Sequence, residues 1–414
     1  MSPCPCLCLC LCLCLCLCLC LCLCLAHARL PPPRNDRKHP ITQSLAHLAQ
    51  ATAARALETT TGGNDGQTCP AAAVPVPSGP DACAIPDGAA GCCCDDSGCV
   101  RAECSGQVHY LSSARYKIGL DAGRGGGICH LSLLTPQNSF QGRNFLNAYD
   151  CGRFLQQSYY GDEDGSHWDG RPWRWNPVMG GSWRNAPSRV LFAGGASGGR
   201  QIAVATVPRN WAGGQLLEDC LMTTAVRFLK EDPALVHVRQ SFTYAASGKK
   251  HAPRTQETPA VFVDRRLGEL CFYDGPAPWT GGPLRRERPG AQPPNSYYKT
   301  TERFAAYVNE RNVGLGVFCP AATGALTAYR VGPDGSEARS DTSYFALTVD
   351  RAIVPGETFV YDCYLAAGTM PEIRAAFRRQ AVRLGMAPAA PSVTRDGEKE
   401  GAPRTLDRSI MHPQ

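Results

Sequence analysis

Short apolar runs separated by turn residues dominate the chain from about residue 107 onward. They include QVHYLSS, YKIGLDA, ICHLSLL, QIAVATV, VHVRQSFTYAA and TFVYDCYLAAG, and Gly, Pro and Asp fall between them. Runs of this length are typical of strands in antiparallel sheets that bury one face. We therefore predict a mainly β fold, a large antiparallel β-sandwich, over residues 107–386.

One segment near the end of the chain has a helical pattern instead. MPEIRAAFRRQAVRL, residues 370–384, carries Pro371 in its first turn and arginines toward its end. Both features suit an α-helix, because proline is tolerated at the first turn and basic residues stabilise the negative end of the helix dipole. A single C-terminal helix is therefore expected, followed by a polar, disordered tail over residues 387–414.

The first 106 residues differ from the rest in composition. Residues 1–28 hold a Leu/Cys repeat with eleven cysteines, and AHA at residues 26–28 resembles a small-residue cleavage site. One interpretation is a secretory signal or membrane anchor, which favours an extracellular location. The other is a low-complexity repeat without a role, because no basic residue precedes it. Residues 29–106 are Pro/Ala-rich and then Cys-rich, and are predicted to be a largely disordered linker.

The remaining thirteen cysteines fall into two groups. Seven lie between Cys69 and Cys104, and the triple run at Cys92 is poor spacing for tetrahedral zinc, so disulfides or disorder are favoured there. The other six are widely spaced within segments that resemble strands, and they are predicted to be buried small hydrophobic residues. They are Cys129, Cys151, Cys220, Cys271, Cys319 and Cys363.

The distribution of charge and the absence of several sequence motifs limit the classes of function that the chain can have. The net charge is +6, and the basic residues are scattered along the chain. No basic block with interleaved aromatic residues indicates nucleic-acid binding. A positively charged face would still suit an acidic substrate. The chain has no phosphate loop, H-E-x-x-H or dinucleotide fingerprint. Phosphoryl transfer and redox chemistry therefore lack support, and no cofactor is predicted. Outside the N-terminal repeat, no stretch is long and apolar enough to span a membrane.

The segment from Tyr149 to Trp183 holds four of the six tryptophans among glycines and charges. Exposed planar rings stack on the apolar face of a sugar, and nearby Asp, Asn, Gln and Arg side chains bind its hydroxyls. We expect some of these rings to pack beneath the loop and at least one to contact a ligand. The predicted binding residues here are Asn147, Asp150, Trp168, Trp173, Trp175 and Asn176. GDEDGSHWDG offers oxygen ligands but not the register of a calcium loop, so no metal is predicted.

Residues 153–160 read as a strand with polar groups on both faces. Strand alternation that starts at Arg153 places Gln157 and Tyr159 on the same face as Arg153. It places Tyr160 on the opposite face. A strand that lines a polar cleft would explain this pattern. A structural pair between Asp150 and Arg153 is the alternative.

Two later segments repeat the combination of rings and charges. HAPRTQETPAVF combines His251, Arg254 and Glu257, which could supply an acid, a cation and a base, although a lone loop histidine is often only solvated. FYDGPAPWTGGPL contributes Trp279, and Glu302 follows, either in the same groove or paired at a strand edge. We expect all of these segments to line one groove.

Five quoted segments carry a family resemblance: GRGGGICHLSL, NFLNAYDCGRFLQQSYYG, RPWRWNPVMGGSW, QETPAVF with FYDGPAPWTGGPL, and TERFAAYVNERNVGLGVFCP. Over about residues 107–377 the chain resembles secreted proteins with the galactose-mutarotase-like β-supersandwich of aldose epimerases, polysaccharide lyases and some glycoside hydrolases. The resemblance implies a sugar on the concave face of the larger sheet, served by His, Glu, Arg or Tyr. It suggests His251 and Glu257 as acid and base and Arg153 and Arg254 as clamps. Tyr159, Tyr160 and His167 are further acid/base candidates, but the epimerase signature histidines are not matched.

The expected function is a carbohydrate-active enzyme that cleaves a polysaccharide. A glycoside hydrolase needs two carboxylates roughly 5 to 9.5 Å apart, and the acidic run from Asp162 to Asp169 offers candidates. A polysaccharide lyase instead needs a base and a cation that neutralises a uronate. The alternatives are a non-catalytic carbohydrate-binding protein and a structural cell-wall protein.

Overall fold

The computed structural model describes residues 92–95, 98–105, 107–134, 142–196, 199–290, 295–332 and 341–388, with only the backbone described for residues 92–105. All of them belong to one compact unit of the chain, Thr52–Gln414. The predicted N-terminal repeat, most of the predicted linker and the tail from residue 389 lie outside the described residues. Among the described residues, no helix is long and apolar enough to cross a membrane.

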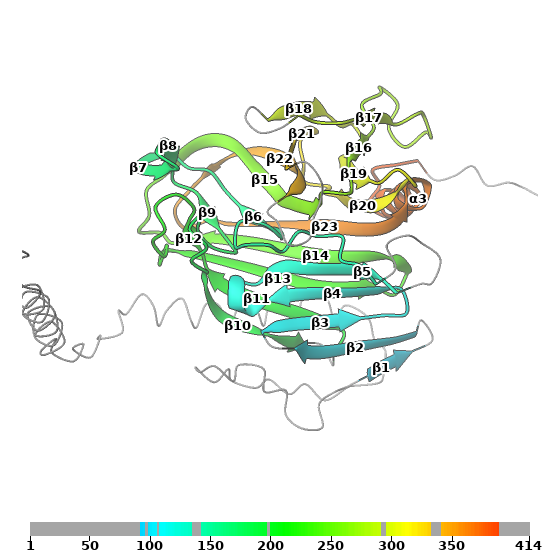
Figure 1. The fold of residues 1–414 in the computed structure, drawn as a ribbon, viewed down its shortest axis with the longest axis horizontal. Coiled ribbons are helices and arrows are strands. Elements are labelled where there is room, and N and C mark those ends of the chain that lie inside the picture. Colours follow the sequence, from blue (N-terminus) through cyan, green and yellow to red (C-terminus); the bar gives the residue numbers. More distant parts are fainter. Residues whose placement is uncertain are drawn as a thin grey trace, which may run out of the picture. The chain divides into compact units, whose positions relative to one another are not determined.

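The larger of two antiparallel sheets has twelve strands, in the order β1-β2-β3-β4-β5-β6-β15-β22-β21-β18, with β9 beside β6 and β12 beside β9 (Figure 1). The strands are β1 (Cys92–Asp95), β2 (Gly98–Ser105), β3 (Val108–Ser112), β4 (Tyr116–Asp121), β5 (Gly127–Leu133), β6 (Leu155–Ser158), β9 (Pro177–Val178), β12 (Arg209–Asn210), β15 (His251–Asp264), β18 (Ser296–Lys299), β21 (Ala325–Val331) and β22 (Thr342–Ile353). A 3-10 turn, η1 (Ala122–Arg124), joins β4 to β5.

The second sheet has nine strands, in the order β10-β11-β13-β14-β23-β20-β19-β16-β17. They are β10 (Arg189–Ala196), β11 (Gln201–Val207), β13 (Cys220–Leu229), β14 (Asp232–Tyr244), β16 (Glu269–Phe272), β17 (Arg285–Glu287), β19 (Phe304–Val308), β20 (Val313–Phe318) and β23 (Thr358–Thr369). A separate hairpin pairs β7 (Glu163–Trp168) with β8 (Arg171–Arg174), and α3 (Met370–Arg383) follows β23. The predicted antiparallel β-sandwich with one C-terminal helix is confirmed.

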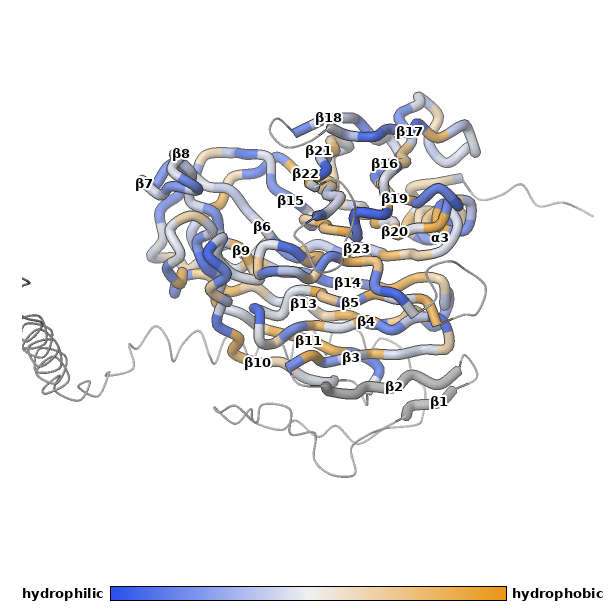
Figure 2. Tube along the Cα trace, in the orientation of Figure 1, coloured by the Kyte–Doolittle hydropathy of each residue, from blue (hydrophilic) through white to orange (hydrophobic). Residues whose placement is uncertain are grey.

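The core lies between the two sheets and follows from strand alternation. In β22, Phe345 and Leu347 belong to the main core, whereas Tyr344 and Ala346 belong to a small cluster on the other face of the sheet. Figure 2 shows hydrophobic positions recurring along the strands of both sheets, while the β7–β8 hairpin is mostly hydrophilic. The six predicted core cysteines are all buried, which confirms their role as small hydrophobic residues.

The sheet begins earlier than the sequence predicted. β1 pairs with β2, and β2 pairs with β3 from Arg101↔Ser112 to Ser105↔Val108. These two strands lie in the segment predicted to be a linker up to residue 106. The predicted boundary at residue 107 is therefore corrected. A strand such as GCVRAECS cannot be recognised from apolar periodicity alone, because its sequence has few large apolar residues.

The helix α3 covers one side of the second sheet, beside β20 and β23 in Figure 1. Its buried face includes Ile373 and Phe377, which pack in a second core cluster with Phe304 and Phe318. Burying one such side chain stabilises the fold by roughly 1.5–3 kcal/mol. The carboxylate of Glu372 accepts hydrogen bonds from the N–H and the hydroxyl of Thr369, which caps the first turn.

A buried ion pair fastens this helix to the second sheet. Glu302 is 0% exposed, and it accepts hydrogen bonds from Arg374 at 2.6 and 2.9 Å and from the Trp279 N–H at 2.7 Å. The indole of Trp279 is 2% exposed and packs against Phe304. The expectation that Trp279 and Glu302 line a sugar groove is corrected. Trp279 is buried in the second core cluster, and Glu302 is buried in its ion pair with Arg374.

Replacement Glu302→Gln is expected to lower the free energy of unfolding by about 3 kcal/mol, because it leaves the guanidinium of Arg374 largely buried without its counter-charge. Urea unfolding followed by fluorescence measures the change. The matched control is Glu218→Gln, which removes one partner of the exposed pair with Arg189 and should change stability by less than about 1 kcal/mol. Equal unfolding midpoints for the two variants would contradict the structural role of Glu302.

Candidate functional site

Glu257 occupies the outer face of the larger sheet, away from the second sheet, because β15 contains a bulge. Glu257 is opposite Thr348 and Ala260 is opposite Ala346, so three steps along β15 match two along β22. In a regular strand Glu257 and Ala260, which are three residues apart, would point to opposite faces. Pro259 lies inside the bulge, where its missing N–H costs no ladder hydrogen bond. The bulge thus turns a carboxylate outward from the middle of a central strand.

Two tyrosines hold the carboxylate. The Tyr160 hydroxyl donates to Glu257 Oε1 at 3.0 Å, and the Tyr344 hydroxyl donates to the same oxygen. Tyr160 follows the end of β6 on one side of β15, and Tyr344 lies in β22 on the other side. Glu257 is 9% exposed and Tyr344 is 2% exposed, so the acid is almost removed from water.

Further rings surround this centre. Tyr329 in β21 stacks on Tyr344 with ring centroids 4.3 Å apart, and Phe262 in β15 lies 4.8 Å from Tyr344. These three residues face one another across neighbouring strands, since Tyr344 is the register partner of both Phe262 and Tyr329. The Arg153 guanidinium lies over the Phe262 ring at 5.3 Å. We call Glu257, Tyr160, Tyr344, Tyr329, Phe262 and Arg153 the Glu257 cluster.

The surroundings set the protonation of the cluster. Burial raises the pKa of Glu257 above its ordinary value, and hydrogen bonds from Tyr344 and Tyr160 offset only part of this shift. Burial, together with the charge of Glu257, raises the pKa of Tyr160 and of Tyr344 well above the ordinary value for a phenol. The carboxyl group can therefore accept a proton near neutral pH more readily than an exposed one, while both phenols stay protonated.

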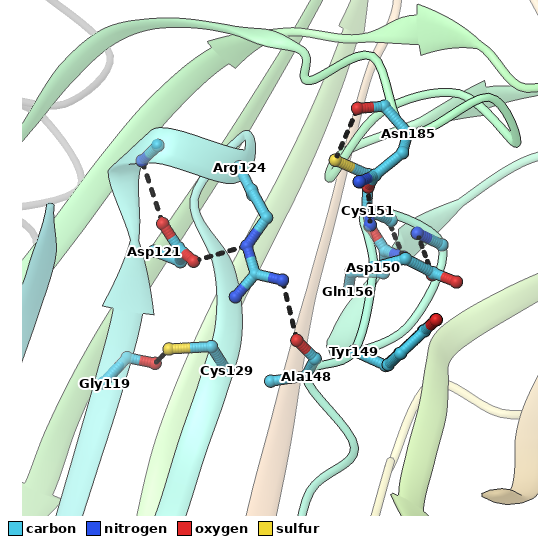
Figure 3. A network of polar contacts seen from close by, with 12 residues as sticks. Gly119, Asp121, Arg124, Cys129, Ala148, Tyr149, Asp150, Cys151, Gln156 and Asn185 are labelled. Carbon is cyan, nitrogen blue, oxygen red and sulfur yellow. Dashed lines mark hydrogen bonds and ion pairs between the residues drawn. The ribbon is translucent and has the colours of Figure 1, made fainter. Parts of the chain in front are cut away.

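Figure 3 shows polar contacts that hold the loop around Ala148 and Cys151, just before Arg153 in the sequence. Arg124 lies between Asp121, which accepts from its Nε at 2.7 Å, and Ala148, whose carbonyl accepts from its NH1 at 2.7 Å. Asn185 accepts the Cys151 N–H at 3.0 Å. These bonds hold the backbone at Ala148 and Cys151, within five residues of Arg153.

Phe154, next to Arg153, has a left-handed backbone with φ of 81°. Such a conformation is strained for a bulky residue and is found most often at functional positions. It also corrects the predicted alternation, which begins at Leu155 rather than at Arg153. Arg153 consequently shares the outer face with Tyr160, and not the inner face with Gln157 and Tyr159.

Gln157 and Tyr159 point into the main core. Tyr159 is 1% exposed and stacks on Phe242 of the second sheet at 4.5 Å, and its hydroxyl donates to Gln157. Gln157 in turn donates to the Thr223 carbonyl at 2.8 Å. The predictions of Tyr159 as acid/base and Gln157 as a ligand contact are corrected, because both side chains lie between the sheets.

His251 is not the partner of Glu257. Its ring stacks on Trp175 at 4.4 Å and lies near Tyr244 of the second sheet, so it faces the core side of β15. Six residue steps along β15 also lead from His251 to Glu257, which is about 20 Å at 3.3 Å per residue. Burial lowers the pKa of His251, and its Nδ1 accepts the Asp162 N–H at 3.1 Å. The predicted acid/base pair is therefore wrong, and Trp175 is a core ring.

The other residues predicted from the same segments have local roles. Asn147 donates to the Asp341 carbonyl at 2.7 Å, and Asp150 accepts the Gly152 N–H at 2.9 Å, so both stabilise the loop. Arg254 pairs with Asp162 at 3.3 Å where β15 begins, away from Glu257 along the strand. His167 is exposed on the β7–β8 hairpin.

The β7–β8 hairpin presents two of the predicted tryptophans. Trp168 and Trp173 are half-buried and meet edge to face at 5.0 Å. The Trp173 indole donates to Asn176 at 3.2 Å, and Asn176 donates to the Ser158 hydroxyl at 3.3 Å. Ser158 is the register partner of Glu257. This chain of contacts joins the hairpin to the outer face beside the Glu257 cluster.

The prediction of one groove lined by all these segments is wrong, since they divide among the outer face, the core and the helix side. Sequence reasoning missed Tyr329 and Tyr344, which complete the Glu257 cluster. Strand alternation in ALTAYRV and TSYFALTVD would have placed both on the face opposite Phe345 and Leu347. Within the described ranges, no group of three His, Cys, Asp or Glu residues is placed to hold a metal ion.

No protein-family model matches the chain, and no curated protein matches it. Among solved structures, a galactose mutarotase related enzyme from Lactobacillus acidophilus is 8% identical over 63% of this chain and 97% of its own, with a TM-score of 0.41. The GalM/aldose epimerase homologue from C. elegans is 8% identical over 62% and 96%, with a TM-score of 0.39. The galactosidase domain of an alpha-galactosidase-sucrose kinase is 8% identical over 64% and 41%, with a TM-score of 0.37. At these identities and TM-scores the similarities assign neither a reaction nor a residue to this chain.

Proposed function

We propose that this protein is a carbohydrate-active enzyme that cleaves a polysaccharide and that Glu257 is its reacting acid/base. The observation that supports this proposal is a carboxylic acid buried among rings, with a raised pKa and two phenol donors on one oxygen. Buried acids with perturbed pKa values cluster at catalytic sites. A polymeric substrate also suits the extracellular location that the sequence favours.

The cluster suits elimination better than hydrolysis. Hydrolysis of a glycosidic bond uses two carboxylates on opposite sides of it, whereas Asp150, in the loop that carries Arg153, already accepts a turn N–H. In elimination from a uronate, Glu257 would take the proton next to the carboxylate, the C–H electron pair would form the new double bond, and the glycosidic C–O bond would break. The leaving oxygen would take a proton from the Tyr160 phenol, while Arg153 would neutralise the uronate carboxylate.

A non-catalytic carbohydrate-binding protein is the second candidate, and the tryptophan hairpin favours it. Trp168 and Trp173 are half-buried rings on a polar hairpin that projects from the sheets (Figure 1). Such rings bind sugars by stacking and need no acid/base. In this case Glu257 would only tie β15 to Tyr160 and Tyr344.

Replacement Glu257→Gln is expected to lower turnover by about 10²–10⁴-fold, the usual contribution of a general acid or base. The assay incubates the protein with a polysaccharide panel and follows both the absorbance of unsaturated uronates and the release of reducing ends. The control Glu310→Gln removes an exposed carboxylate on the β19–β20 turn and should leave rates unchanged. Wild-type protein that binds glycan without either signal would establish the binding function instead.

The stability of the protein should depend on the titration of Glu257. Because burial raises the pKa of Glu257 in the folded protein above the ordinary 4.5, the folded state holds the proton more tightly than the unfolded state. The resulting stabilisation is present below about pH 4.5 and is lost as pH rises through the folded-state pKa. The unfolding midpoint of the wild type should thus fall, relative to that of Glu257→Gln, as pH increases. A difference between the two proteins that stays constant in urea titrations would show that Glu257 does not titrate with a raised pKa.

Replacement Trp173→Ala is expected to weaken retention on insoluble polysaccharide by roughly tenfold, which corresponds to the loss of about 1.4 kcal/mol of binding free energy. Affinity electrophoresis or pull-down measures the change. Trp183→Ala serves as a control, because that indole donates to the Ala212 carbonyl in a neighbouring loop rather than pairing with Trp168. Equal retention of both variants would remove the hairpin from the binding surface.

A further inference from the structure

A cavity lies on the helix side of the molecule, formed by the β16–β17 loop, the β19–β20 turn and the first half of α3. Its volume is about 530 Å³, which is within the range of small-molecule sites. Apolar surface comes from Leu284, Met370 and Ala375, and three arginines, Arg286, Arg374 and Arg378, line the same space. Ala375 and Arg286 are exposed, so the cavity opens to solvent.

The three arginines differ in how their charge is balanced. Arg374 is bound to the buried carboxylate of Glu302, and Arg286 pairs with Glu269 and donates to Asn312 at 2.8 Å. Among the described residues, Arg378 has no carboxylate partner and donates only its Nε, to the Trp279 carbonyl at 3.0 Å. The cavity therefore carries one positive charge that no acid of the described chain neutralises.

The backbone at the wall of the cavity is strained. Trp279 has φ of 66°, which is an outlier for a bulky residue, and it is held from two sides. Its N–H donates to Glu302 at 2.7 Å, and its carbonyl accepts from Arg378. Such strain persists where surrounding contacts over-determine a loop, and it concentrates at ligand sites. The same two side chains thus fix the loop and place Arg378 against the cavity.

We propose that this cavity is a second binding site, for a small organic anion. Its carboxylate or phosphate group would meet the guanidinium of Arg378, which offers a planar fork of N–H donors. Its apolar part would lie against Leu284, Met370 and Ala375. The site is independent of the Glu257 cluster, because its residues come from the second sheet and α3.

Isothermal titration calorimetry of the full chain tests this proposal with four probes. Phenyl phosphate and phenylacetate carry the two anionic groups on an apolar ring, benzyl alcohol lacks the charge, and inorganic phosphate lacks the ring. The wild type should bind at least one of the first two probes more tightly than either of the last two. Which of the first two binds more tightly distinguishes a phosphate ligand from a carboxylate ligand.

Two variants locate the binding. Arg378→Gln removes the unneutralised charge and should weaken the tighter probe by at least about tenfold, equivalent to 1.4 kcal/mol. Ala375→Trp fills the opening without removing a charge or a hydrogen bond, and should abolish binding even if Arg378→Gln disturbs the loop. Arg311→Gln is the matched control, since it removes an exposed arginine beside Asn312 that does not line the cavity.

Three outcomes would overturn the proposal. The first is that neither ring-bearing anion binds the wild type at millimolar concentration. The second is that inorganic phosphate binds as tightly as phenyl phosphate, because the apolar wall would then have no role. The third is that Ala375→Trp binds as well as the wild type, because binding would then occur elsewhere.

Discussion

A single extra residue in β15 decides which face of the larger sheet carries the carboxylate of Glu257. The bulge between Glu257 and Ala260 rotates the carboxylate out of the core and into contact with Tyr160 and Tyr344. A regular strand would direct the same carboxylate between the sheets, where burial of its charge would be costly. The tyrosine contacts and the raised pKa of Glu257 both follow from this local geometry.

Buried acids in this protein fall into two kinds according to their partners. For Asp232, burial acts to raise the pKa, but hydrogen bonds and charge from Arg379 hold the pKa below its ordinary value. For Glu257 the partners are neutral phenols, so burial prevails and the pKa rises. An acid paired with arginine stays ionised and fastens α3 to β14, whereas an acid paired with phenols remains able to exchange a proton.

The three surfaces for which a function is proposed lie on different layers of the sandwich. The Glu257 cluster and the tryptophan hairpin belong to the outer side of the larger sheet, joined through Asn176 and Ser158. The arginine-lined cavity belongs to the second sheet and α3. Trp279 and Glu302 resembled sugar-site residues in the sequence, yet they brace the wall of that cavity. A tryptophan near an acidic residue in the sequence is therefore a buried structural contact at Trp279 and Glu302, but a partly exposed surface on the β7–β8 hairpin.

Most of the secondary structure after residue 107, and much of the core, could be predicted from the sequence alone. Short apolar runs between turn residues predicted most of the strands, and the pattern around Pro371 predicted α3. The six buried cysteines were predicted from their wide spacing within predicted strands. These signals depend on local geometry and burial. The sequence also identified Glu257, Tyr160 and Arg153 as candidates. Only the tertiary structure decided that they meet, that Tyr329 and Tyr344 join them, and that His251 does not. Bulges, left-handed residues such as Phe154 and pairing between distant strands set which side of a sheet a residue faces, and none of these is encoded in residue spacing.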